Sequence, residues 1–415
     1  MDIQRMLLVV IFGMSAVFLW NEWQKLANPH PQVATAPASA PSIPAPGSDA
    51  APSAPASGSV PAGSSVPASS ATVPTAGGVP PVASATGTAT GERITLESDV
   101  LRLVVNTVGG VIEEADLRTQ QGTLDKSKPY QLLLNTKDRL HVAQAGLLGD
   151  GLPNHKTIYT AVPGPRAMDG ADTLQFRLTT PITQGPAAGG KVDQVITLKK
   201  GSFVVDVAFD ITNPGSAPLA ATAYYHLLRD NKMPAGESSM VPTYTGPAIY
   251  DDVDKFKKVD WSDVEKKKVK YAAKSDNGWV AMVEHYFVAA IMPRDKVERE
   301  IYANKLEDGN FRAGVKVTLP PVAAGSTAHI DVPIYLGPQE QDTLGRTAEG
   351  LDRVVDYGIF HVLAAPLFLL LSWLHKLVGN WGWSIILLTI LIKAVFYPLN
   401  AASARSMAKL KMVAP

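Results

Sequence analysis

The stretch NWGWSIILLTILIKAVFYPL, residues 380–399, contains a single charged residue, Lys393. At about 1.5 Å per residue, an α-helix of this length matches a bilayer hydrocarbon core of roughly 30 Å. The basic residues Arg405, Lys409 and Lys411 follow it, with no acidic residue among them. Because basic residues are retained on the cytoplasmic side of a membrane, residues 380–399 are predicted to be a transmembrane helix whose C-terminal end faces the cytoplasm.

Lys393 is the most informative residue of this helix. A charge at the centre of a membrane span costs roughly 2.5–3.5 kcal/mol on insertion scales. Lys393 lies about six residues, or ~9 Å, before the cytoplasmic end, so its ammonium could snorkel to the interface. It could equally face a wet cavity inside a helical bundle, and the residues alone leave both interpretations open.

The preceding apolar segment, residues 359–374, is interrupted by His361, Pro366 and Ser372. If it also crossed the membrane, the basic tail would lie outside, against the positive-inside rule. We therefore expect region 346–379 to contain an amphipathic helix that lies in the membrane interface. Gly379 and Asn380 are then expected to turn the chain into the span.

The N-terminal end carries a second apolar run, residues 6–20. The first plausible signal-peptidase site, Ala38-Ser39-Ala40, lies far downstream of the apolar run, so residues 1–26 are predicted to be an uncleaved transmembrane anchor rather than a signal peptide. Residues 27–92 are rich in Pro, Ala and Ser and contain almost no charge. This composition predicts a disordered linker, either a tether that distances the next domain from the anchor or, as we favour, a spacer without a sequence-specific role.

Residues 93–345 consist of strand-length apolar runs separated by turn signals. The runs 192–198 and 203–211 flank Lys199-Lys200-Gly201-Ser202, which predicts a β-hairpin. A regular helical period is largely missing, except for one or two helices expected near residues 251–267 or at the end. The pattern predicts an all-β sandwich of many strands, on the side of the membrane opposite the basic tail.

The sequence contains few features that indicate a catalytic, metal or cofactor site. Net charge is zero, with 38 basic and 38 acidic side chains, and there is no cysteine. Glu113 and Glu114 are adjacent, so on a strand they are expected to face opposite sides. No Gly-x-Ser-x-Gly elbow or Gly-x-x-x-x-Gly-Lys loop occurs, and no two histidines have metal-ligand spacing. We therefore expect no enzyme activity, metal, cofactor or nucleic-acid partner, whereas a sugar- or peptide-binding cleft stays open. The five histidines of this domain are His141, His155, His226, His285 and His329.

Several stretches resemble the YidC/Oxa/Alb family of membrane protein insertases, in the Gram-negative form with a large periplasmic domain. NWGWSIILLTILIKAVFYPL is the most specific of them, and the resemblance covers nearly the whole chain from Arg93 onward. The others are LRLVVNTVGGVIEEADL (101–117), VITLKKGSFVVDVAFDITN (195–213), NGWVAMVEHYF (277–287), YLGPQEQD (335–342), DYGIF (356–360), PLFLLLSWLHKLVG (366–379) and SMAKLKM (406–412).

This resemblance implies a β-supersandwich periplasmic domain and a hydrophilic groove that is open to the cytoplasm and the lipid. The family's groove carries a positive residue, usually Arg, and Lys393 occupies the matching position. Lys keeps the charge and loses the planar fork of Arg, which puts bidentate contacts in doubt.

The implied activity is insertion, folding and assembly of inner-membrane proteins without nucleotide hydrolysis, alone or with the Sec translocon. The implied partners are newly made membrane proteins, Sec translocon subunits and membrane lipids.

The implied location is the bacterial inner membrane, with residues 27–379 on the periplasmic side and both termini in the cytoplasm. The family has five conserved spans, and residues 400–415 match only the start of the cytoplasmic hairpin that follows the first. A protein made of these 415 residues alone is expected to lack insertase activity. It would then be a tethered periplasmic scaffold or a carbohydrate-binding sandwich.

Overall fold

A computed structural model describes residues 91–234, 236, 243–266, 268, 271–294, 296–355 and 361–413. The expected anchor, and the expected linker up to residue 90, lie outside these residues. Eighteen strands occur in the described part of the chain: β1 Arg93–Glu97, β2 Leu101–Asn106, β3 Val111–Gln121, β4 Pro129–Asn135, β5 Leu140–Leu148, β6 Thr160–Ala161, β7 Thr173–Pro181, β8 Lys191–Lys199, β9 Val204–Asn213, β10 Thr222–Arg229, β11 Gly246–Asp251, β12 Lys255–Lys258, β13 Lys274–Ser275, β14 Trp279–Val283, β15 Phe287–Ile291, β16 Arg299–Lys305, β17 Phe311–Thr318 and β18 Ser326–Pro338.

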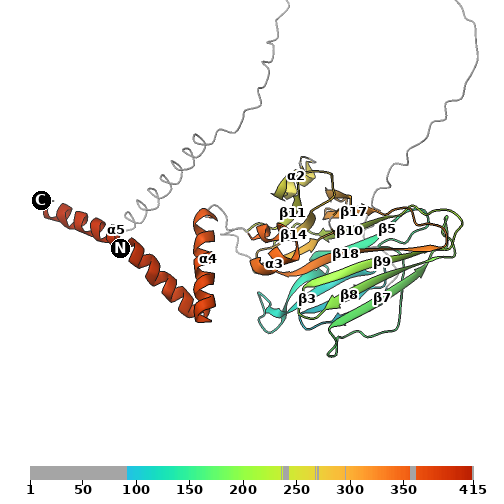
Figure 1. Cartoon of the computed structure of the whole chain (residues 1–415), viewed down its shortest axis with the longest axis horizontal. Coiled ribbons are helices and arrows are strands. Elements are labelled where there is room, and N and C mark those ends of the chain that lie inside the picture. The colour runs from blue at the N-terminus through green and yellow to red at the C-terminus, as the bar shows by residue number, and fades with distance from the viewer. Residues whose placement is uncertain are drawn as a thin grey trace, which may run out of the picture. The chain divides into compact units, whose positions relative to one another are not determined.

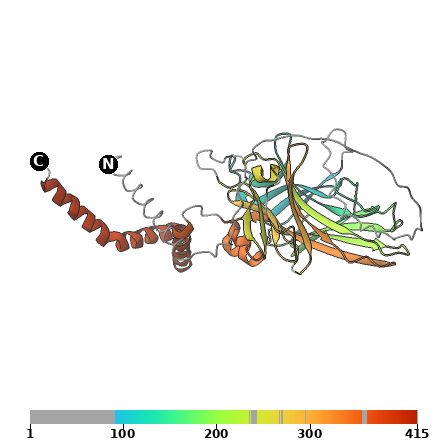
Figure 2. The same ribbon diagram turned by 90° about the horizontal axis from the view of Figure 1, so that it is seen from above.

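Within the described residues these strands form two antiparallel sheets of nine strands each (Figures 1 and 2). The first sheet has the order β1-β2-β3-β4-β5-β10-β17-β16-β13, and the second β12-β11-β14-β15-β18-β9-β8-β7-β6. Side chains of strands alternate between faces, and the apolar faces of both sheets share one core. Leu103, Leu227 and Val315 of the first sheet pack there with Val207 and Ile334 of the second. The predicted β-rich sandwich with C-terminal apolar helices is confirmed.

The hairpin predicted around Gly201 is also confirmed. β8 pairs with β9 from Lys191↔Thr212 to Leu198↔Val205, and Gly201 adopts a positive φ of 67° in the turn. The apolar run 279–292 is divided by Glu284, His285 and Tyr286 into β14 and β15, which pair with each other.

Among the described residues, three short helices accompany the sandwich. The helix expected near residues 251–267 is only α2, Trp261–Glu265, because the preceding residues form β12 and pair with β11. α3, Gln341–Thr347, and the 3₁₀ helix η1, Leu351–Val354, contribute Leu344, Leu351 and Val354 to a second core against β11, β14 and β15. Figure 1 shows α3 beside β14 and β18.

Two long helices end the described chain. α4 spans His361–Val378 and α5 spans Trp381–Val413. The segment Trp381–Met407 is the one described helix long and apolar enough to cross a membrane, and it contains an 18-residue stretch with a mean hydropathy of 1.9. The α5 helix continues through Pro398 into residues 400–413, so the expected span and the basic segment after it form one helix.

Candidate functional site

Lys393 lies within α5 with its side chain exposed, and no described residue forms an ion pair or hydrogen bond with it. Many of the neighbouring exposed side chains are apolar, including Ile390, Val395 and Phe396. The described residues provide no counter-charge for this ammonium. Its charge must therefore be compensated by groups outside them.

Lys393 belongs to a polar stripe on α5. Thr389, Lys393, Tyr397 and Asn400 are spaced at i, i+4, i+8 and i+11, which places them on one face of a continuous helix. The Thr389 hydroxyl donates to the Ile385 carbonyl at 2.8 Å, which partly satisfies this polar group within the helix. A stripe of this kind is expected on a helix that lines a wet cavity, whereas a single snorkelling lysine needs no polar neighbours.

The turn between α4 and α5 is tightly specified. Gly379 adopts a φ of 72°, and its amide donates to the His375 carbonyl at 2.7 Å, which closes the end of α4. Asn380 caps α5, because its side-chain oxygen accepts from the Gly382 amide at 2.8 Å. The rings of His375 and Trp381 stack at 3.9 Å. The turn expected at Gly379 and Asn380 therefore lies between two helices that contact each other.

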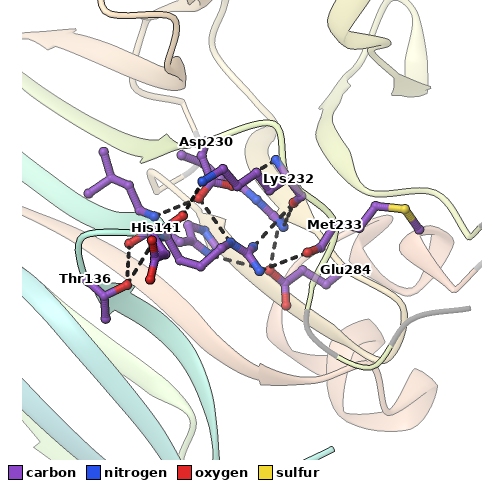
Figure 3. Close-up of polar contacts among 10 residues, drawn as sticks. Thr136, His141, Asp230, Lys232, Met233 and Glu284 are labelled. Atoms are coloured by element: carbon purple, nitrogen blue, oxygen red, sulfur yellow. Dashed lines mark hydrogen bonds and ion pairs between the residues drawn. The ribbon is translucent and has the colours of Figure 1, made fainter. Parts of the chain in front are cut away.

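A second cluster of charged groups is buried inside the β-domain, and Figure 3 shows its polar contacts. Glu284, in the turn between β14 and β15, lies 2.9 Å from the guanidinium of Arg229 on β10, whose side chain is fully buried. The Tyr130 hydroxyl donates to the other Glu284 oxygen at 2.6 Å. His141 of β5 lies 3.6 Å from Glu284, beyond hydrogen-bond length. Beside them, Asp230 accepts hydrogen bonds from the amides of Leu140 and Lys232.

The protonation states in this cluster follow from burial and charge. Burial opposes ionisation of Glu284, but the Arg229 charge, the neighbouring His141 and the Tyr130 hydrogen bond outweigh it and lower its pKa to about 2. Burial lowers the pKa of His141, and the Arg229 charge lowers it further, although Glu284 opposes this. The cluster therefore holds one carboxylate, one guanidinium and a neutral imidazole at neutral pH. The cluster links strands of the first sheet to a turn of the second. This arrangement indicates a structural role.

One expectation about polar residues of the β-domain was wrong. Glu113 and Glu114 do not face opposite sides, because a β-bulge shifts the register between β2 and β3 there, and both carboxylates contact Arg93. His155 and His226, distant in sequence, lie 5.9 Å apart between ring centroids. Their hydrogen bonds go to other side chains, the ring of His155 to the Tyr224 hydroxyl and that of His226 to Gln144 and Tyr302. Among the described residues, no group of three or more potential ligands could hold a metal ion.

Comparison with known proteins decides the family. The profile described as the YidC periplasmic domain matches residues 93–370, and the profile described as the 60Kd inner membrane protein matches residues 373–415. A protein of Nitrosospira multiformis named membrane protein insertase YidC is 41% identical over the whole chain and over 72% of its own length. The chain belongs to the YidC family. Its relative in Dechloromonas aromatica, also named membrane protein insertase YidC, is 42% identical over the whole chain and 71% of its own length.

Among solved structures, this YidC-family chain is similar to a galactose mutarotase-like protein from Clostridium acetobutylicum. The match covers 59% of the chain and 95% of that protein, at 10% identity and a TM-score of 0.40. So low a score carries no argument about function. Lys393 lies in the segment matched by the inner-membrane-protein profile, whereas the cluster around Glu284 lies in the periplasmic-domain profile.

Proposed function

We propose that this YidC-family chain is a membrane protein insertase of the bacterial inner membrane in which Lys393 receives polar parts of incoming proteins. The observation that carries the proposal is the polar stripe of α5, because it places Thr389, Lys393 and Asn400 on one face of the mainly apolar stretch 385–400. A wet groove along this face would hold a substrate's polar segment while its apolar segment moves into lipid.

The proposed mechanism is physical rather than chemical. Moving a polar group through hydrocarbon without partners costs several kcal/mol, and a hydrated groove lowers this cost. The substrate's apolar segment supplies the driving force, since burial of apolar surface contributes about 25 cal/mol per Å². No covalent intermediate or nucleotide takes part, and Lys393 acts as an electrostatic contact.

The proposed topology follows the charge distribution. Residues 1–26 anchor the chain, residues 27–92 link the anchor to the domain formed by residues 93–345, and residues 27–379 lie on the periplasmic side. The region 346–379 lies in the interface, residues 380–399 cross the membrane, and residues 400–415 begin a cytoplasmic hairpin. Arg405, Lys409 and Lys411 support the cytoplasmic placement of the last segment.

The proposed partners are newly made membrane proteins, membrane lipids and, for some substrates, subunits of the Sec translocon. Exposed apolar side chains on α4, such as Leu363, Leu369 and Trp373, support lipid contact. Translocon contact is testable by crosslinking from the same helix in native membranes.

The test replaces Lys393 in the native gene and measures insertion of reporter proteins with acidic or neutral periplasmic tails. Lys393→Arg is expected to insert both kinds, because the charge remains. Lys393→Glu is expected to impair acidic-tailed reporters by roughly tenfold or more and neutral ones less, because it places like charges together. Normal insertion of every reporter with Glu would contradict the electrostatic role.

A matched charge exchange separates the groove from snorkelling. Combining Lys393→Val with Val395→Lys keeps composition and moves the ammonium about 200° around the helix, about 3 Å nearer the cytoplasmic end. If Lys393 only snorkels, this variant inserts reporters as well as the parent. If Lys393 faces the groove, insertion of acidic-tailed reporters falls.

A further inference from the structure

A groove lies between β18 of one sheet and β17 of the other. It has a volume of about 530 Å³, within the range of ligand-binding clefts. Its walls are mainly apolar and include Val297, Leu319, Ala328 and Ile330. We call this cavity, lined by Pro293, Arg294, Val297, residues 317–323, Ser326 and residues 328–332, the β18 groove.

One edge of β18 is unpaired inside this groove. β18 pairs with β9 from Ser326 to Tyr335, but β15 pairs only with its last part, from Ile334 to Pro338. The last hydrogen bond on the β15 side runs from the Met292 amide to the Pro333 carbonyl at 2.9 Å. The chain then leaves the sheet at Pro293, so the first half of β18 has a strand on one side only.

The direction of the free backbone groups follows from strand geometry. Residues two apart in an antiparallel strand present their amides and carbonyls to the same neighbour. Pro333 faces β15, so Thr327, His329 and Asp331 direct their backbone groups to the open side. No other described residue hydrogen-bonds to the backbone of these three. An open strand edge of this kind accepts an added strand.

The charges around the groove favour an uncharged occupant. Arg294 and Asp331 neutralise each other, with Arg294 Nε 2.8 Å from Asp331 Oδ2. His329 is bonded through Nδ1 to Asp210 at 2.6 Å. The described lining residues therefore offer apolar contacts and backbone hydrogen bonds, and together they carry no net charge to attract an ionic ligand.

We propose that the β18 groove binds an extended, uncharged apolar segment of an incoming membrane protein, which pairs with β18 as an additional strand. The open stretch of about six residues spans roughly 20 Å, so it pairs with a segment of similar length. The substrate class rests on the proposed insertase function, whereas the strand pairing rests on the groove alone.

The test uses the full chain in lipid nanodiscs and a fluorescein-labelled octapeptide of alternating Val and Thr. Saturable binding is expected, and the same peptide N-methylated at alternate amides is expected to bind at least about tenfold more weakly, because it cannot donate to the edge. Equal binding of both peptides, or no saturable binding, would overturn the proposal.

Two substitutions at one position isolate the strand edge. His329→Ala and His329→Pro both remove the imidazole, but only the second removes the amide that faces the groove. Pro333 already occupies an equivalent position in β18, so proline is compatible with the β9 ladder there. His329→Pro is expected to weaken peptide binding about two- to tenfold relative to His329→Ala. Equal affinities of the two variants would contradict strand pairing.

A third variant covers the case in which His329→Pro does not fold. Ala328→Trp fills the groove without changing the backbone and is expected to abolish saturable peptide binding. Unchanged binding would refute the groove as the site.

Two other outcomes would overturn the proposed occupant. If the chain dimerises and His329→Pro prevents this, the occupant is a second copy of the chain. If lipid copurifies with the chain and Ala328→Trp displaces it, the occupant is a lipid. Lys393→Glu is expected to leave peptide binding to the β18 groove unchanged. Failure of the proposed insertase mechanism at Lys393 can therefore be told apart from failure of strand pairing at β18.

Discussion

Glu284 is a carboxylate removed from water and kept ionised by its neighbours. Only 5% of its side chain is exposed, and the fully buried Arg229 depends on it for charge compensation. Breaking one side of a buried ion pair costs more than the pair contributes, because the remaining charge stays buried. Glu284 therefore matters to the stability of the β-domain because its loss would leave the charge of Arg229 buried without a partner.

We expect Glu284→Gln to destabilise the β-domain by about 3–5 kcal/mol, because it leaves Arg229 without a counter-charge. The measurement is the shift of the urea unfolding midpoint of the detergent-solubilised chain. Glu298→Gln is the matched control, since its pairing with Lys274 is solvent-exposed and is expected to change stability by less than about 1 kcal/mol. Equal effects of the two substitutions would show that the buried pair of Glu284 and Arg229 contributes no more to stability than an exposed pair.

The residues of this cluster could not be found from the sequence. Lys393 is visible because a charge interrupts a local apolar run, and its position along the helix needs no tertiary knowledge. Arg229, His141 and Glu284 come from β10, β5 and the turn after β14, and each looks ordinary in its own segment. Only the pairing of β5 with β10 and the packing of the two sheets bring them together.

At the scale of elements, local signals predicted turns well and irregular pairing poorly. Gly201 and Gly379 lie at positive φ, where the absence of a Cβ is a direct sequence signal. The bulge that turns Glu113 and Glu114 toward Arg93 depends on the register between β2 and β3, which leaves no mark in the sequence of β3 alone. The expected helix near residues 251–267 was shortened by the pairing of β12 with β11.

The turn between α4 and α5 provides a test at this scale. A Cβ on Gly379 would meet no atom within 4 Å, so the cost of substitution comes from its φ of 72°. We expect Gly379→Val to cost about 1–2 kcal/mol and to loosen the angle between the helices. The chain contains no cysteine, so spin labels on cysteines introduced at Leu369 and Ile390 would report the interhelical distance directly.

The expected result for Gly379→Val is a broader or shifted distance distribution. Gly345→Ala in α3 is the control, because its nearest contact would be Asp352 Cβ at 3.8 Å and it is expected to leave the distance unchanged. An unchanged distribution in Gly379→Val would mean that the stacking of His375 on Trp381 fixes the turn without the glycine.

At the scale of the whole molecule, the sequence predicted the class of the β-domain but not its strand order. Strand-length runs and turn signals are local, and they were sufficient to indicate a sandwich with apolar helices at its end. The placement of β10 between β5 and β17, and of β18 between β15 and β9, is decided by contacts between distant segments. The β18 groove could not be foreseen for the same reason, since its two walls belong to different sheets.

The buried titratable groups together set the acid stability of the β-domain. Burial lowers the pKa of His155 to about 4, and burial also lowers the pKa values of His141 and His226. Below pH 6.5 the unfolded chain binds protons at these positions that the folded chain does not, so stability falls as the pH falls. His155 alone accounts for about 3 kcal/mol between pH 6.5 and pH 4, and Glu284 adds a loss in the same direction from about pH 4.5 to pH 2.

We therefore expect the free energy of unfolding to be highest above pH 6.5 and to decline continuously below it. The measurement is hydrogen–deuterium exchange of β10 amides in the full chain between pH 7.5 and pH 4, corrected for the intrinsic pH dependence of exchange. His155→Phe removes one titrating group, so its stability should fall less steeply between pH 6.5 and pH 4 than that of the parent, whatever its absolute stability. Parallel pH profiles of the two proteins would show that His155 is protonated as readily in the folded domain as in the unfolded chain, and His155 would then play no part in acid unfolding.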